Sequence, residues 1–141
     1  MVLDNWKVYM AKIDGFSTLV RINMTAKEQG WANEFPLCVV LTLQVLAKEE
    51  NGFPTEAELA RLETIEQAIL PVIDKHGKLA VSLLSQEGTQ DLIMFTDKPT
   101  ELSSAVDKKL ISLDIPEAEF QLGSPDGDDQ WAWYDFVYPK D

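Results

Sequence analysis

The segment from Trp131 to Tyr138 constrains the fold of this chain more than any other. Five of its eight residues are aromatic, and Pro139 follows it directly. We predict that it forms the last strand, with side chains that alternate between two faces. One face would carry Trp131, Trp133, Asp135 and Val137, and the other Ala132, Tyr134, Phe136 and Tyr138. Because both faces would carry rings, this strand is either sandwiched inside the fold or offers one face to a partner.

The composition is that of one globular domain over residues 1–141. Hydrophobic residues make up 45% of the chain and charged residues 26%, which argues against disorder. No apolar run approaches the roughly 20 residues that span a bilayer, and the first five residues do not read as a signal peptide. The single Cys38 lies in an apolar run, where we expect a buried, inert thiol. A cytoplasmic, reducing setting fits this cysteine usage.

The charge is strongly negative and unevenly distributed. The net charge of −12 argues against direct binding of nucleic acid and of anionic membranes. Residues 114–141 carry eight acids against one base, a net of −7, whereas the first thirty residues have a net charge of +1. One interpretation is that a basic partner docks on the C-terminal third. The other is that the acids only keep a small protein soluble.

The N-terminal half predicts three strands and a long helix. Asp14-Gly15 is a strong two-residue hairpin signal between two alternating runs. Residues 25–36 are expected to form a loop, and Leu37–Leu46 a central strand. Thr55 and Glu58 form a capping-box pattern before an apolar helical stripe that ends near Gly77. Within this helix Pro71 predicts a kink or a stretched turn, because it removes one backbone hydrogen bond.

The C-terminal half continues the pattern. Residues 79–84 and 92–95 predict a hairpin through Gly88, and Pro99 suits the first turn of a second helix. Apolar and polar residues alternate over residues 117–122, which predicts another strand with one solvent-exposed face. The order is β-β-β-α-β-β-α-β-β, an α+β fold. Its core is a ferredoxin-like split βαβ arrangement, β-α-β-β-α-β, extended by the N-terminal hairpin and the C-terminal aromatic strand. We expect a mainly antiparallel sheet with its helices on one face.

No cluster of residues predicts a catalytic centre or a cofactor. The chain has one histidine and one cysteine, so neither a zinc site nor a Cys-His pair is indicated, and His76 fits a helix end. The aspartates of the Asp126–Asp129 loop are the best cation ligands. The twelfth position of a calcium loop would fall on Val137, so a solvated turn is the preferred interpretation. Cation binding by this loop stays open.

Three segments carry a resemblance to a known family. These are Asn5-Trp6-x-Val8-Tyr9, Leu62-Glu63-x-Ile65-Glu66, and the terminal Trp-x-Trp-Tyr-x-Phe-x-Tyr-Pro. Together they resemble a bacterial family called domain of unknown function 695, over roughly residues 4–139. The resemblance implies a small bacterial cytoplasmic protein. Since no activity is assigned to the family, it transfers no catalytic residue.

The function class that the sequence favours is a non-enzymatic protein-binding or regulatory module. It would dock a protein partner, or a second copy of itself, through the acidic C-terminal third and an aromatic face. The candidate contact residues are Trp31, Trp131, Trp133, Tyr134, Asp135 and Tyr138, with Trp31 expected to be exposed in its loop. Filling the core is the competing role for these rings.

The alternative is a small-ligand binder or enzyme. Its cleft would lie between the N-terminal hairpin and the last strand, and a carboxylate such as Asp135 would supply the chemistry. Purely structural homodimerisation through a sheet edge or a helix face is a third hypothesis.

Overall fold

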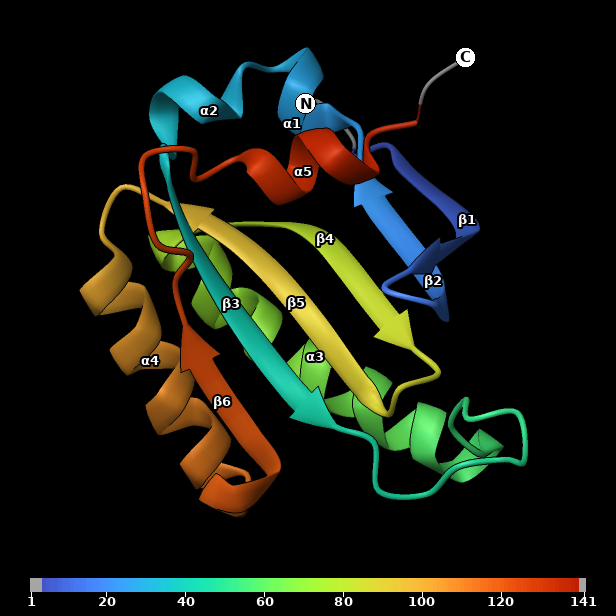
Figure 1. Ribbon diagram of the computed structural model, residues 1–141. Helices are drawn as coiled ribbons and strands as arrows, with labels where there is room; N and C mark the ends of the chain where they lie inside the picture. The colour runs from blue at the N-terminus through green and yellow to red at the C-terminus, as the bar shows by residue number, and fades with distance from the viewer. Residues whose placement is uncertain (1–3, 140–141) are drawn as a thin grey trace.

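The computed structural model describes residues 4–139 and contains one six-stranded antiparallel sheet, in the order β1-β2-β4-β5-β3-β6 (Figure 1). Its strands are β1 (Trp6–Ile13), β2 (Phe16–Asn23), β3 (Leu37–Gln44), β4 (Gly77–Ser85), β5 (Thr89–Thr96) and β6 (Phe120–Gly123). Both β3 and β4 pair antiparallel with β5, which lies between them, so β3 and β4 run in the same direction. The N-terminal hairpin extends the sheet beyond β4, as expected.

Helices lie on both faces of the sheet (Figure 1). They are α1 (Thr25–Glu28), α2 (Trp31–Glu34), α3 (Glu56–His76), α4 (Pro99–Ser112) and α5 (Ala132–Val137), with a 3₁₀ turn η1 (Glu117–Glu119). The long helices α3 and α4 cover one face, and α1, α2 and α5 gather at one end of the other. The prediction of an α+β antiparallel fold is confirmed, and the two predicted helices, α3 and α4, share one face as expected. The short helices α1, α2 and α5 on the other face were not predicted. In the described part of the chain, no helix is long and apolar enough to cross a membrane.

Two apolar clusters correspond to these two faces. The larger cluster joins the inward stripes of α3 and α4 to the sheet, and includes Leu62, Ile69 and Leu102, each at most 1% exposed. The second cluster lies under the short helices and includes Ile22, Phe95 and Tyr134. Because each sheet face has its own cluster, the central strands β4 and β5 are buried on both sides.

The turn chemistry of the sequence is confirmed in both hairpins. Asp14 and Gly15 connect β1 and β2 with φ values of 53° and 85°, the positive values that a two-residue hairpin turn needs. Gly88 lies in the connection between β4 and β5 and has a φ of 111°. The expected loop at residues 25–36 instead contains the single-turn helices α1 and α2.

The start of α3 has half of the predicted capping box. The Thr55 hydroxyl accepts a hydrogen bond from the Glu58 amide at 3.2 Å. The Glu58 carboxylate does not return this bond. It accepts from the Leu46 amide at 2.5 Å and pairs with Arg61, whose Nε lies 2.6 Å away. The Arg61 hydrogen bond and the Leu46 amide hold the pKa of Glu58 below its usual value, against the opposing effect of burial. Glu58 therefore ties the helix to the end of β3.

The end of α3 leads directly into β4. The helix continues through Pro71 to His76, and Gly77 follows as its C-cap. Gly77 has extended backbone, and a Cβ built there would lie 2.1 Å from the Phe95 carbonyl oxygen. Close approach of β5 therefore requires glycine here. The Thr96 hydroxyl bonds the His76 carbonyl at this junction.

The predicted last strand at residues 131–138 is wrong, because this segment forms the helix α5. The sheet consequently has six strands rather than seven, and its edge is the short β6. The inward residues Trp131, Tyr134 and Val137 recur every three positions, a spacing that suits one face of a helix. Strand preference of aromatic residues is weak against such packing.

We expect Tyr134→Phe to lower the free energy of unfolding by about 1–3 kcal/mol, because it leaves the buried Asn23 carbonyl and the part-buried Lys27 amide without their partner. Chemical denaturation measures the loss. The matched control is Tyr138→Phe, which keeps the ring that contacts Lys27 and should change stability little. Equal stability of the two variants would contradict a stabilising role for the Tyr134 hydroxyl.

Candidate functional site

The inward side of α5 is fixed to the sheet by ring packing. Trp131 stacks on Phe95 of β5 with ring centroids 3.6 Å apart, and its Nε1 donates to the Phe35 carbonyl at 3.0 Å. Tyr134 packs edge-on against both rings and is only 2% exposed. Two residues of the predicted contact set, Trp131 and Tyr134, are thus anchors of the helix rather than contact surface.

Hydrogen bonds join α5 to the N-terminal segment. The Tyr134 hydroxyl donates to the Asn23 carbonyl at 2.8 Å and accepts from the Lys27 amide at 3.2 Å. Burial raises the pKa of Tyr134 to about 12, so this hydroxyl stays protonated over the physiological range. The Tyr9 hydroxyl of β1 donates to the Val137 carbonyl. These contacts hold α5 against segments far away in the sequence.

Two further residues of the predicted set also belong to this docking. Tyr138 receives the Lys27 ammonium over its ring at 4.2 Å. Trp31 is 8% exposed, so its expected exposure is wrong. It begins α2 and packs edge-on against Phe35, within the cluster beneath the short helices.

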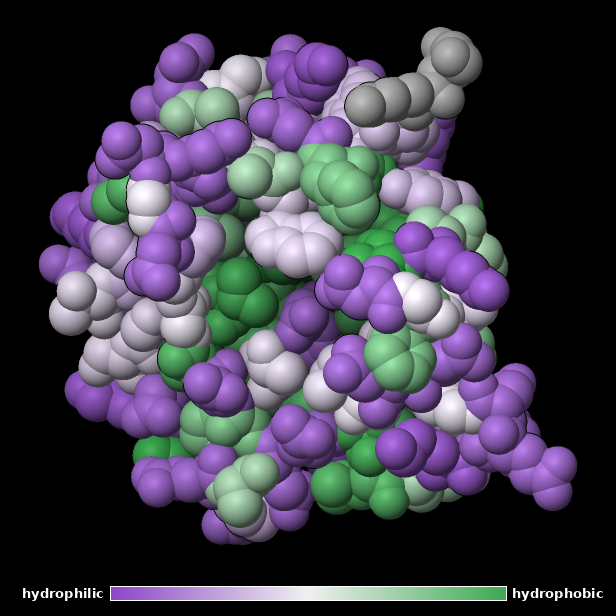
Figure 2. All heavy atoms as spheres, viewed as in Figure 1, coloured by the Kyte–Doolittle hydropathy of each residue, from purple (hydrophilic) through white to green (hydrophobic). Residues whose placement is uncertain are grey.

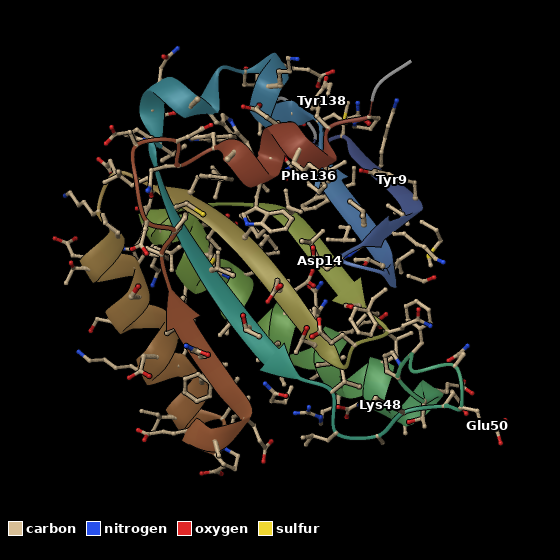
Figure 3. All side chains as sticks on the ribbon, viewed as in Figure 1. Tyr9, Asp14, Lys48, Glu50, Phe136 and Tyr138 are labelled. Carbon is tan, nitrogen blue, oxygen red and sulfur yellow. The ribbon has the colours of Figure 1, made fainter. Side chains whose placement is uncertain are left out.

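The outward side of α5 carries an exposed pair of rings. Trp133 is 37% exposed and Phe136 is 62% exposed, and their rings meet edge-to-face with centroids 5.5 Å apart. We call Trp133, Phe136 and the neighbouring Ala132 the aromatic patch. A shallow depression of about 260 Å³ is lined by these three residues. Figure 3 places Phe136 on α5 and Tyr9 on the adjacent hairpin.

A second depression continues from the aromatic patch onto the sheet. It has a volume of about 270 Å³ and is lined by Trp133, by Val40 and Thr42 of β3, and by β6 and the two residues that follow it. Figure 2 shows that the viewed face is hollowed in its middle, with hydrophobic side chains beside hydrophilic ones. The short helices therefore leave part of this sheet face open next to Trp133.

The floor of this open face contains a carboxylate that the sequence did not single out. Asp91 of β5 lies opposite Thr42 and accepts a hydrogen bond from its hydroxyl at 2.6 Å. Burial raises the pKa of Asp91, and the Glu87 charge adds to the rise, while the Thr42 bond opposes it. By contrast Asp135, the carboxylate predicted to serve the site, is exposed on α5. The sequence signal that could have found Asp91 is the alternation of side chains along β5, which places this carboxylate on a sheet face within a largely apolar strand.

The loop that precedes α5 organises the end of β3. Because β6 pairs only with residues 40–43 of β3, the first residues of β3 lack a strand neighbour on that side. The Gln130 side chain fills part of this role by accepting from the Cys38 amide at 3.1 Å. It also donates to the carbonyls of Pro125 and Gly127, which closes the acidic loop. Cys38 is buried as predicted, and burial raises the pKa of its thiol to about 12.

Within residues 4–139, no group of three or more His, Cys, Asp or Glu side chains could hold a metal ion. The exposed aspartates of the Asp126–Asp129 loop therefore do not converge on one point. They contribute negative charge beside α5.

Comparison with protein families gives one match. A family model described as a family of unknown function, DUF695, matches residues 4–138. The chain belongs to this family. No curated protein and no solved structure matches it significantly. The matched range includes both the aromatic patch and its buried anchors.

We expect Asp91→Asn to raise the free energy of unfolding at neutral pH. The folded-state pKa of Asp91 lies above the 3.8 of an unperturbed aspartate, so this group favours folding only when protonated. That contribution is complete below pH 3.8 and is lost as the pH rises through the raised pKa. The substituted amide side chain should still accept the Thr42 hydrogen bond but carries no charge. The difference in free energy of unfolding between this variant and the unaltered protein should therefore vanish below pH 3.8.

Denaturant titration across pH, together with an NMR titration of the Asp91 carboxyl, measures this effect. The matched control is Asp97→Asn, which removes one charge at an exposed position. A neutral-pH loss of stability in Asp91→Asn alone would show that the buried carboxylate supports the fold.

Proposed function

We propose that this protein is a non-enzymatic protein-binding or regulatory module whose contact surface is the aromatic patch. The observation that carries the proposal is the solvent exposure of Trp133 and Phe136 on a helix whose opposite side is fixed to the sheet. Exposing large aromatic rings to water is unfavourable, so exposed rings often mark an interaction site. Trp in particular is enriched among the residues that dominate binding energy. A helix already anchored by Trp131 and Tyr134 loses little further freedom on binding.

The charge around the patch supports a basic partner. Asp135 on α5 and the aspartates of the Asp126–Asp129 loop are exposed, and Asp91 lies on the adjoining sheet floor. A partner that places a cationic, partly apolar segment across α5 would match this arrangement. Its binding should weaken as salt screens the charges. A second copy of this acidic chain matches less well, because both copies would bring negative charge.

We further propose that the core is the ferredoxin-like split βαβ arrangement. The strand order β4-β5-β3-β6, with α3 and α4 as the two connections on one face, supports this topology. The N-terminal hairpin is then an added element. Since a fold of this kind serves many functions, it does not enter the argument for binding. A cytoplasmic location is also a proposal, supported by the buried, high-pKa thiol of Cys38.

A small-ligand or enzymatic function is the second candidate, and one observation favours it. Asp91 is a partly buried carboxylate with a raised pKa, next to Thr42 at the border of the depression that Trp133 lines. In this version of the hypothesis, Asp91 takes the place of Asp135. Loss of ligand binding in Asp91→Asn, with full binding in Phe136→Ala, whose ring does not line this depression, would favour it over the protein-binding module.

The test is affinity capture from the native host with Trp133→Ala/Phe136→Ala as the patch variant. The matched control is Leu46→Ala/Ile111→Ala, which also removes two exposed apolar side chains, 54% and 48% exposed, away from α5. We expect the unaltered protein and the control to retain a basic protein at low salt and release it at moderate salt. The patch variant should lose at least about tenfold in affinity, as for a binding hot spot.

Both variants change exposed residues, so their folding should be unaffected, which circular dichroism and thermal melting verify. Retention of the same protein with equal affinity by the patch variant would eliminate α5 as the contact surface. Crosslinking from position 136, but not from position 111, would place the partner directly on the patch.

A further inference from the structure

A groove lies on the other side of the sheet, between α3 and the N-terminal hairpin. It consists of two adjoining cavities of about 350 Å³ and about 220 Å³, which share Arg21, Glu66 and Gln67. We call it the α3 groove. None of its lining residues belongs to the aromatic patch, and α3 lies behind the sheet in the view of Figure 1. The groove is therefore independent of the contact surface proposed above.

The middle of the α3 groove is a neutral bridge. Arg21 of β2 pairs with Glu66 of α3, whose side chain is 10% exposed, and the guanidinium lies 5.7 Å from the centre of the Trp6 ring. Because the two charges compensate, neither sets the charge of the groove. Apolar side chains flank the bridge on both sides, among them Leu59 and Leu70.

Carboxylates at the two ends set the charge. Glu63 lines one cavity, and Asp74 lines the other together with Asp4. Of the lining residues that the structure describes, Lys78 is the one base that offsets these three acids. Apart from the central Arg21–Glu66 pair, the lining therefore carries a net charge of −2. Glu63 and Asp74 are separated by roughly 16 Å along α3, at about 1.5 Å per residue. No described group of acids could chelate one metal ion, so this separated charge suits an extended polycation.

A buried amide on the groove floor points to the same chemistry. Gln90 of β5 lines the larger cavity and is 6% exposed. Its Nε2 donates to the Ser82 hydroxyl at 3.1 Å, while its Oε1 has no hydrogen-bond partner among the described residues. An acceptor left without a donor in such a place is uncommon in folded proteins. Because this oxygen is itself buried, a ligand N–H in the cavity would satisfy it once the Gln90 amide turns toward the cavity.

We propose that the α3 groove binds a linear aliphatic polyamine. Terminal ammonium groups would pair with Glu63 and Asp74, the methylene chain would lie along the leucines, and an internal ammonium would supply the donor for Gln90. Spermine is a suitable probe, because its terminal nitrogens in the extended chain are separated by a distance of the same order as the two carboxylates. A short diamine such as putrescine cannot reach both ends.

Isothermal titration calorimetry with spermine, putrescine and Mg²⁺ tests the proposal. We expect saturable binding of spermine at one site and much weaker binding of the other two. Glu63→Gln/Asp74→Asn should raise the Kd for spermine by about tenfold, the effect of losing two charge contacts at exposed carboxylates. The matched control is Glu101→Gln/Glu117→Gln, which removes the same charge at exposed positions outside the groove. It should bind as the unaltered protein does.

Three results would overturn the site. They are an absence of saturable spermine binding, equal weakening in the control variant, and competition by Mg²⁺ at the same charge concentration. The patch variant Trp133→Ala/Phe136→Ala separates the two proposals, since it should bind spermine fully. NMR amide shifts should move on α3 and β2 and not on α5. Shifts confined to α5 would instead assign the polyamine to the acidic C-terminal segment.

Discussion

The hydroxyl of Tyr134 connects two segments that lie more than 100 residues apart in the sequence. It joins the end of β2 and the start of α1 to the C-terminal helix through two hydrogen bonds, inside an apolar cluster. Because polar groups buried there need partners, this bridge fixes both where α5 lies and which way it turns. The stack of Trp131 on Phe95 then sets its distance from the sheet. The outward direction of Trp133 and Phe136 follows from these anchors.

The docking of α5 also explains how the two sheet faces differ. On one face α3 and α4 form a continuous cover over the large cluster. On the other, only the short helices at one end supply cover, so the sheet floor around Thr42 and Asp91 stays accessible. The proposed protein contact surface therefore lies on the incompletely covered face. The α3 groove lies on the opposite face, where α3 does not extend over the hairpin and Val8 and Met10 of β1 remain exposed.

Much of the fold could be predicted because its signals are local. The Asp14-Gly15 turn, the threonine cap of α3 and the proline at the start of α4 each act within a few residues. The failures are at positions where distant contacts decide. The carboxylate of Glu58 serves the Leu46 amide and Arg61 rather than its own helix start. Trp31 was expected in solvent, but the cluster under the short helices buries it.

The sequence by itself determined the order of the six strands and the two long helices up to Gly123, the excess of acid near the C-terminus, and the family. Only the tertiary structure decided the conformation of residues 131–138 and the role of each ring. A run whose aromatic residues would fall on both faces of a strand is compatible with a strand and with a helix, because either element can bury part of it. The choice depended on free space above β5, on the Gln130 side chain beside β3, and on the buried partners of Tyr134. None of these is encoded within the segment itself.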